Sequence, residues 1–291
     1  MTLPTSDTVV LYPSGATTSE STVVHVEPLE DGRLAILLDR TAAHPVDSTW
    51  PDQGPDRGAM DAGDIVIPLV DVVVGATDGE NLFLGSDIPV RKGTDGWTFV
   101  VAHLVAEDSG LTEGDTVTVE VDAGYRTALS AGHTGCHLAS LALNAALAGS
   151  WSKEVALDAA GSPNFDALAI ETTTIREDGS LDVYRIGKSL RKKGFDPSGL
   201  EDPQAIENRA NDLLAGWVAG GGGIHIETDG DGLTDRRYWV AELTERERRI
   251  PCGGTHAHSL ADFESVRVTL VPEPADGALG LVMTTVVRRR P

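Results

Sequence analysis

The sequence predicts an α+β protein with a β-rich first half, about residues 1–125, and a mixed second half, residues 126–291. The length of 291 residues suggests two domains, at ~150 residues per domain. Short runs of alternating or β-branched residues fill the first half, whereas an alanine-rich segment near residue 133 begins a region in which helix and strand patterns alternate. Hydrophobic residues make up 41% of the chain, which is enough to form cores.

The first half is expected to form short strands separated by turns. Thr116–Val121 keeps an almost strict period of two, the pattern of a strand with one buried face. A long loop is expected from Pro45 to Gly63, which is rich in proline, aspartate and glycine. Several short strands with such loops predict a small β-barrel. The other expected strands are Thr22–Val26, Arg33–Leu38, Ile65–Val74 and Trp97–Leu104.

Two helices are expected in the second half. His133–Leu147 consists mostly of strong helix formers and contains no proline. Asp202-Pro203 provides an N-cap followed by proline at the first helical position, and Gly220–Gly223 ends this second helix. The boundary between the two halves is expected near residues 124–131. Strand-like runs follow at Ile224–Ile226, Tyr238–Leu243, Ser265–Val271 and Leu279–Val287.

Composition and charge exclude several classes of protein. The formal net charge is −22, from 23 basic and 45 acidic residues, which argues against coating of duplex DNA by a broad basic face. No secretory signal is visible, and the most apolar stretch, Leu138–Gly149, is too short to span a bilayer. Two cysteines do not make a disulfide framework. We therefore expect a soluble, cytoplasmic protein with no membrane partner.

Two short windows carry residues suited to a transition metal. His133 and His137 are four residues apart, which places both imidazoles on one face of the expected helix. In Pro251-Cys-Gly-Gly-Thr-His256, a glycine-rich turn brings a thiolate and an imidazole together. Either window alone is often a chance pair or an ordinary turn, but the chain has only two cysteines and eight histidines. Because Zn²⁺ accepts both donor types, we predict a zinc site of His133, His137, Cys252 and His256.

Several known motifs of hydrolases and of nucleotide-binding proteins are missing from the sequence. Thr134 occupies the position at which a zincin protease carries its general-base glutamate. There is no Gly-x-Ser-x-Gly elbow and no Gly-x-x-x-x-Gly-Lys-Ser/Thr loop. The run Gly220–Gly223 lacks the spacing of a dinucleotide-binding fingerprint and is expected to be a flexible connection.

The two metal windows resemble those of a known family. His133-Thr-Gly-Cys-His137-Leu and Pro251-Cys-Gly-Gly-Thr-His256 resemble the paired zinc motifs of the alanyl-tRNA synthetase editing domain and of the free-standing alanyl-tRNA editing proteins. The Cys-Gly-Gly-Thr-His motif is specific, and the resemblance extends from about Val23 to Val271. Looser matches are Leu38-Asp-Arg-Thr41, Gln53-Gly-Pro-Asp-Arg-Gly58, the region Thr98–Asp122 and the segment Ile206-Glu-Asn-Arg-Ala-Asn211.

The resemblance implies a β-barrel domain, residues 1–125, followed by a zinc-binding α/β editing domain, residues 126–291, like that of threonyl- and alanyl-tRNA synthetases. It implies ATP-independent hydrolysis, in trans, of the ester in seryl- or glycyl-tRNA of alanine identity. Backbone N–H groups near Gly253 and Gly254 would stabilise the developing oxyanion. The implied catalytic and metal residues are His133, His137, Cys252 and His256, and the implied substrate contacts are Gln53, Thr134, Cys136, Gly253, Gly254 and Thr255.

Three departures from the family pattern bear on selectivity. Thr49-Trp-Pro-Asp52 replaces a glycine triplet, Cys136 replaces a threonine before the second histidine, and Ala159 replaces a glutamine. A thiol is a poorer hydrogen-bond partner than a hydroxyl, so the preferred amino acid stays open. Four protein ligands are typical of structural zinc, whereas hydrolytic zinc keeps a position for water. The alternatives are a non-catalytic zinc-stapled module that binds an aminoacyl or RNA end, and a metal-dependent hydrolase of another small ester or amide.

Contact with misacylated tRNA requires positive charge in this acidic chain. The densest cluster holds five cations in nine residues: Arg185, Lys188, Arg191, Lys192 and Lys193. We expect this cluster to bind phosphate groups, with a solvated surface as the alternative. Nothing in the sequence predicts the oligomeric state.

Overall fold

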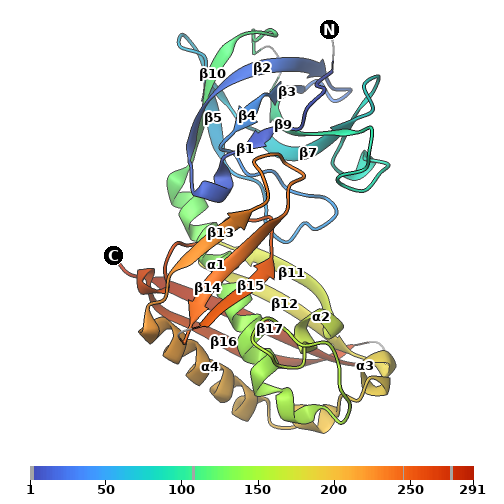
Figure 1. Cartoon of the computed structure of the whole chain (residues 1–291), viewed down its shortest axis with the longest axis vertical. Coiled ribbons are helices and arrows are strands. Elements are labelled where there is room, and N and C mark those ends of the chain that lie inside the picture. The colour runs from blue at the N-terminus through green and yellow to red at the C-terminus, as the bar shows by residue number, and fades with distance from the viewer. Residues whose placement is uncertain (1–2, 107–108, 245, 276–277) are drawn as a thin grey trace. The chain divides into compact units, whose positions relative to one another are not determined.

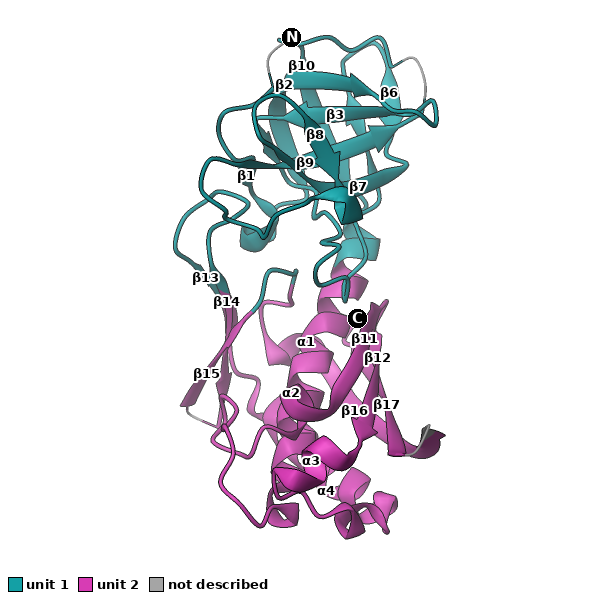
Figure 2. Ribbon diagram, turned by 90° about the vertical axis from the view of Figure 1, so that its right-hand side faces the viewer, with its two compact units in different colours: residues 1–126, 226–237, 252–255 teal, residues 127–225, 238–251, 256–291 magenta. Residues whose placement is uncertain are grey.

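The computed structural model describes residues 3–106, 109–244, 246–275 and 278–291 (Figure 1). Residues 1–126, 226–237 and 252–255 form unit 1, and residues 127–225, 238–251 and 256–291 form unit 2 (Figure 2). Both units contain antiparallel sheets, and the described residues also form four α-helices, so the fold is mixed α+β. The predicted α+β class is therefore confirmed.

Unit 1 is built on an eight-stranded sheet in which every neighbouring pair is antiparallel. A separate two-stranded parallel pair joins β1 (Val9–Val10) to β4 (Arg40–Thr41). The strands of the large sheet are, in spatial order, β6 (Val66–Pro68), β5 (Gly58–Asp61), β10 (Thr116–Val121), β2 (Thr18–Pro28), β3 (Leu34–Leu38), β9 (Thr98–Val105), β7 (Asp71–Thr77) and β8 (Leu82–Leu84).

The burial of these strands follows their residue patterns. In β10 and in the first part of β2, buried and exposed positions alternate, as period-two strands require. The central strands β3 and β9 are buried at nearly every position, because one core packs on each face of this part of the sheet. Fully buried side chains such as Ile36, Met60 and Phe99 form the larger core.

Three details of unit 1 differ from the sequence prediction. The expected loop Pro45–Gly63 contains β5, a strand too short and too glycine-rich to show a period. β5 approaches β10 so closely that a Cβ on Gly58 would lie 2.1 Å from the Glu120 carbonyl oxygen, so this position requires glycine. The single strand expected at Ile65–Val74 is two strands, β6 and β7, and Pro68 ends the first of them.

The expected small β-barrel is not found. The sheet begins at β6 and ends at β8, and no pairing between these two end strands is present among the residues that the structure describes. Unit 1 is therefore described as an open antiparallel sheet with two cores.

The remaining strands form two further sheets. The four-stranded sheet has the order β11-β12-β17-β16 and is antiparallel throughout, which makes this half α+β in type rather than α/β. The three-stranded sheet has the order β13-β14-β15. The strands are β11 (Ile170–Arg176), β12 (Gly179–Ile186), β13 (Ile224–Thr228), β14 (Arg237–Leu243), β15 (Arg246–Pro251), β16 (Phe263–Ala275) and β17 (Ala278–Arg289), and the helices are α1 (Ala123–Ala146), α2 (Phe165–Ala169), α3 (Lys188–Lys192) and α4 (Pro203–Gly220).

Both predicted helices are present. α1 packs closely on the four-stranded sheet through two glycines: a Cβ on Gly132 would lie 2.2 Å from the Arg176 carbonyl oxygen, and one on Gly135 would lie 2.5 Å from Val287. α4 begins at the predicted cap, where the Asp202 carboxylate accepts a hydrogen bond from the backbone N–H of Ala205 at 3.0 Å. Close approach of α1 fixes the helix face that carries His133 and His137.

α4 lies beside β16, and its polar side chains bind the edge of that strand (Figure 1). The Asn211 amide accepts from the backbone N–H of Val268 at 2.8 Å and donates to its carbonyl at 2.9 Å. The Glu207 carboxylate accepts from the N–H of Leu270 at 2.9 Å. Within the described residues, no helix combines the length and the apolarity needed to cross a membrane.

Candidate metal centre

Helix α1 supplies the first two candidate ligands. His133 and His137 lie one turn apart, and their ring centroids are 5.0 Å apart in a stacked arrangement. His133 is buried, whereas His137 is partly exposed. The predicted spacing on one helix face is therefore present in the structure.

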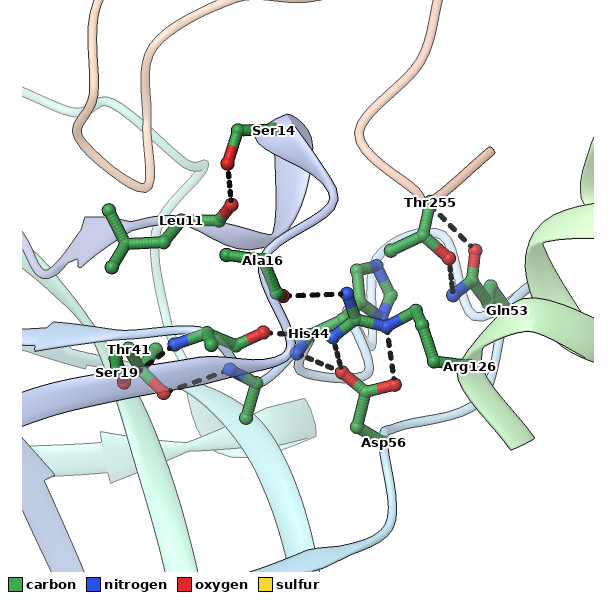
Figure 3. Close-up of polar contacts among 12 residues, drawn as sticks. Leu11, Ser14, Ala16, Ser19, Thr41, His44, Gln53, Asp56, Arg126 and Thr255 are labelled. Atoms are coloured by element: carbon green, nitrogen blue, oxygen red, sulfur yellow. Dashed lines mark hydrogen bonds and ion pairs between the residues drawn. The ribbon is translucent and has the colours of Figure 1, made fainter. Parts of the chain in front are cut away.

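The loop after β15 supplies the other two. Its entry is fixed where the backbone N–H of Cys252 donates to the Arg237 carbonyl at 3.0 Å. Its middle is held by Gln53, whose side-chain amide donates to Thr255 Oγ1 at 3.0 Å and accepts from the Thr255 backbone N–H at 3.0 Å (Figure 3). Both residues are buried. Gln53 therefore positions the loop that carries Cys252 and His256.

The four residues form one group. One ligand atom each from His133, His137, Cys252 and His256 can be chosen so that all lie within 4.8 Å of one another. The His256 ring centroid is 4.3 Å from that of His133 and 5.0 Å from that of His137. Three imidazoles and one thiol are donors that transition metals accept. This group could hold a metal ion.

Thr134 orients one of these imidazoles. Its hydroxyl is fully buried, lies 3.3 Å from His256 Nδ1 and accepts a hydrogen bond from the Ala257 backbone N–H at 3.0 Å. When His256 Nδ1 carries the proton and donates to this oxygen, His256 Nε2 is the unprotonated nitrogen, the form that coordinates a metal. A hydrogen bond of this kind fixes both the tautomer and the ring orientation of a metal ligand.

An indole ring packs against the histidines. The Trp239 ring centroid lies 5.1 Å from that of His137 and 6.1 Å from that of His256, and the side chain is fully buried. A packed aromatic side restricts the imidazole rotamers and keeps water from that side of the group. A strand is predicted at this position from the sequence, but no local pattern connects it with the site.

Burial raises the pKa of Cys252 to about 12, with the backbone N–H of Gly254 lowering it and the negative charge of Asp52 raising it. Without a metal the thiol is therefore protonated at neutral pH. Coordination requires the thiolate, so binding of a metal ion at this residue releases a proton.

The other predicted substrate residues occupy different environments. Gly253 is exposed, and a Cβ there would meet nothing within 4 Å, whereas Gly254 is buried. Cys136 is buried on α1, where its thiol lies 3.6 Å from the Asp182 carboxylate of β12. Burial, together with the charge of Asp182, raises the pKa of Cys136. Cys136 is therefore a neutral thiol that donates to a buried carboxylate.

Asp182 belongs to a polar cluster inside unit 2. Its carboxylate accepts hydrogen bonds from the hydroxyls of Thr173 at 2.8 Å and Ser180 at 2.9 Å. Farther along β12, the Tyr184 hydroxyl donates to Asp166 at 2.8 Å. Burial raises the pKa of Asp166 to about 6; the bond from Tyr184 opposes this shift and the charge of Asp182 adds to it. Sequence analysis missed this cluster, although polar residues at alternate positions of β12 are its signal.

Unit 1 contains a buried ion pair between Arg126 and Asp56, three residues after Gln53. The Arg126 guanidinium donates to Asp56 Oδ1 at 2.8 Å and contacts Asp56 Oδ2, and it also donates to the Ala42 carbonyl at 2.8 Å (Figure 3). Asp56 in turn accepts from the His44 backbone N–H at 2.5 Å. The pair therefore ties the start of α1 to the chain on either side of residues 45–55.

The predicted basic cluster is exposed. Arg185 lies near the end of β12, and its guanidinium is 3.7 Å from Glu171. The four other cations lie on α3 or directly after it, and all of them are exposed: Lys188, Arg191, Lys192 and Lys193. One of the five charges is thus partly balanced by an acidic neighbour.

The fold and the site define a mixed α+β protein with a His₃Cys group suited to a metal ion. No known protein-family model matches the chain. The chain is 26% identical to the alanyl-tRNA editing protein AlaX-M of Pyrococcus horikoshii over 233 residues, which cover 80% of this chain and 78% of that protein.

Alanine–tRNA ligases match as well. Identity is 26% over 283 residues with the ligase of Halorubrum lacusprofundi and 28% over 181 residues with that of Ruegeria pomeroyi. The match covers 96% and 60% of this chain but only 26% and 19% of the ligases, so the chain spans about a quarter or less of their length. The chain is homologous to the alanyl-tRNA editing protein and to a segment of the ligases, as its motifs predicted.

Proposed function

We propose that the protein hydrolyses the ester bond of mischarged aminoacyl-tRNA in trans, with seryl- or glycyl-tRNA of alanine identity as the substrate class. The observation that carries the proposal is the gathering of His133, His137, Cys252 and His256 in a chain homologous to an alanyl-tRNA editing protein. The proposal includes a division of labour between an N-terminal domain, residues 1–125, and an editing domain, residues 126–291.

The donor set supports Zn²⁺ as the metal. Three imidazoles and one thiolate match its tetrahedral coordination with nitrogen and sulfur ligands. Bound there, zinc supplies Lewis-acid polarisation and orientation of the ester. Four protein ligands favour orientation of the substrate over a permanently open water position.

The chain's own residues then have distinct parts. Thr134 orients the His256 imidazole, and Gln53 holds Thr255 so that the loop presents its backbone. Gly253 carries no side chain and is exposed, so its N–H group is accessible to a developing oxyanion. Cys136 stands where the family carries a threonine and is the residue by which we expect selectivity for the amino acid to differ.

The exposed cations of α3 are proposed to bind tRNA phosphates. Neutralising Lys192 and Lys193 together is expected to remove two phosphate contacts. The slope of the logarithm of tRNA affinity against the logarithm of salt concentration should then become shallower by ~0.7–0.9 for each contact. Neutralising Arg289, in the run Arg288 to Arg290 near the end of the sequence, serves as the control. Its guanidinium is already paired with Asp178 at 2.6 Å. An unchanged slope in the lysine variant would assign this cluster to ordinary solvated surface.

The test of the proposed function is a deacylation panel with metal control. Zinc-loaded protein is incubated with seryl-, glycyl- and alanyl-tRNA of alanine identity, with and without a chelator, and zinc is then restored. We expect loss of the seryl or glycyl ester, no loss with chelator, and recovery with zinc. Absence of hydrolysis across the panel by fully loaded protein refutes the enzyme and favours a module that binds the RNA end.

A further inference from the structure

Trp50 is the most exposed tryptophan of the chain. Its side chain is 64% exposed, whereas each of the other four tryptophans is buried or half-buried. A large aromatic ring left in water is unfavourable, and exposed tryptophans are typical of surfaces that bind another molecule. Trp50 stands in Thr49-Trp-Pro-Asp52, the segment that replaces the family's glycine triplet.

The segment that presents Trp50 is held by several polar contacts. The backbone N–H of Trp50 donates to the Asp47 carbonyl at 3.1 Å. The Asp47 carboxylate accepts from the N–H and the hydroxyl of Thr49, at 3.0 and 2.6 Å, and pairs with Lys92 at 3.0 Å. Before it, Val46 is bonded to Val72 of β7 at 2.9 Å. The indole therefore projects from an ordered turn, which limits the entropy lost when it binds a ligand.

Trp50 also belongs to the same part of unit 1 as the candidate metal loop. Trp50 is three residues before Gln53, so their Cα atoms are at most about 10 Å apart. Gln53 is bonded to Thr255 through both ends of its amide.

We propose that Trp50 is a stacking platform for the terminal nucleobase of the aminoacylated RNA end. The inference rests on the proposed function, because the reacting ester is attached to the ribose of that terminal nucleotide. A base one ribose away from the ester must lie close to the loop that carries Cys252, and an exposed indole there matches its flat π-face.

Charge favours a base over a phosphate at this position. The charged groups nearest to Trp50 in the turn are Asp52 and Asp47, of which Asp47 is paired with Lys92. The turn therefore carries net negative charge, as does the chain as a whole at −22. Phosphate would be repelled by such surroundings, whereas stacking of an uncharged base is not weakened by them. Apolar protein contacts are disfavoured as well, because apart from Pro51 the neighbours in the turn are polar and do not form the apolar centre that a protein interface needs.

Binding of unacylated RNA tests the inference without any hydrolysis. A minihelix ending in CCA is compared with one that lacks only the terminal adenosine, using full-length wild type and the variants Trp50→Ala, Trp50→Phe and Val66→Ala. Val66 is a matched control, because it is an exposed apolar side chain of the same unit, 66% exposed. A folded state common to all four proteins is checked by circular dichroism.

We expect the wild type to bind the CCA minihelix about tenfold more tightly than the shortened one, since stacking contributes ~1–3 kcal/mol per base. Trp50→Ala should remove this preference without weakening binding of the shortened RNA, whereas Trp50→Phe keeps most of it and Val66→Ala keeps all. A preference that survives in Trp50→Ala overturns the inference. So does a change in elution volume of Trp50→Ala with unchanged RNA binding, which would assign the ring to a contact between protein copies.

The two proposals fail separately. If the wild type shows no deacylation but Trp50→Ala still abolishes the preference for the terminal adenosine, the stacking role stands and the hydrolytic function falls. If the wild type deacylates and Trp50→Ala discriminates the two RNAs as the wild type does, the function stands and the stacking role falls.

Discussion

Replacing Gln53 by alanine should weaken metal binding although Gln53 is not a ligand. The Gln53 amide makes two hydrogen bonds of 3.0 Å with Thr255, and both residues are buried. Two neutral hydrogen bonds contribute about 1 kcal/mol each, and removing the acceptor of a buried N–H costs a further ~1–3 kcal/mol. The variant therefore loses about 3–5 kcal/mol of the free energy that orders residues 252–256.

This loss should appear in metal affinity, because the loop supplies two of the four candidate ligands, Cys252 and His256. A metal that must order the loop itself binds more weakly by the same free energy, and the lower figure of ~3 kcal/mol corresponds to more than about 100-fold. The assay is a zinc titration of the metal-free protein in competition with a chromophoric chelator. Thr255→Val keeps the backbone bond and loses only the hydroxyl, so we expect about a fivefold effect from ~1 kcal/mol.

A general loss of stability must be separated from this effect. Met60→Ala is the control, because Met60 is fully buried in the core of the same unit and its truncation should cost ~2–5 kcal/mol of unfolding free energy. At a temperature where all variants are folded, Met60→Ala should bind zinc as the wild type does. Zinc affinity of Gln53→Ala within twofold of the wild type would refute the reasoning and show that the loop is ordered without Gln53.

Two further substitutions test the buried charges. Arg126→Met should lower the unfolding free energy measured in urea by about 3–5 kcal/mol, because it leaves the fully buried Asp56 carboxylate without its guanidinium; Arg126→Met with Asp56→Asn should recover part, and a loss below 1 kcal/mol would contradict a structural role. Asp166→Asn should stabilise the protein: the pKa of Asp166 is raised to about 6, above its value of ~3.9 in unfolded chains, so the charged form costs stability that appears as pH rises from 4 through 6. The full pKa shift corresponds to ~3 kcal/mol of unfolding free energy, and we expect a gain of about 2 kcal/mol at pH 8 because Asp166 is only partly buried. The gain should vanish near pH 4. An equal gain at both pH values would contradict the assignment.

The sequence predicted the parts of this protein that depend on local pattern. The period of β10 and the cap of α4 are written in consecutive residues, and so is the four-residue spacing of His133 and His137. β11 and β12 were missed, since β11 is rich in exposed threonine and β12 places Ser180 and Asp182 at inward positions where a strand usually carries apolar residues. The usual hydrophobic alternation is therefore hidden in both strands.

Apart from the metal group, which its donor types reveal, contacts between distant residues could not be predicted from one sequence. Arg126 and Asp56 are 70 residues apart, and Gln53 and Thr255 are 202 apart, so no local pattern connects either pair. Trp239 likewise packs against the histidines only because β14 is folded beside them. The predicted barrel rested on the short strands with their loops and on the family resemblance. Closure depends on pairing between end strands, which short-range periodicity does not encode.

The residues that carried the family resemblance form two groups: one makes hydrogen bonds within the fold of unit 2, and the other makes hydrogen bonds to the candidate metal site. Glu207 and Asn211 accept hydrogen bonds from backbone N–H groups of β16, so the polar atoms of this motif hold α4 against the sheet. Gln53 and Thr134 use their polar atoms on the loop and on His256, which favours positioning over direct substrate contact. Under the proposed function, we therefore expect recognition of the substrate to depend most on groups that differ from the related proteins or remain exposed. Variation at Trp50, Cys136 and Gly253 should then alter selectivity while leaving metal affinity in place.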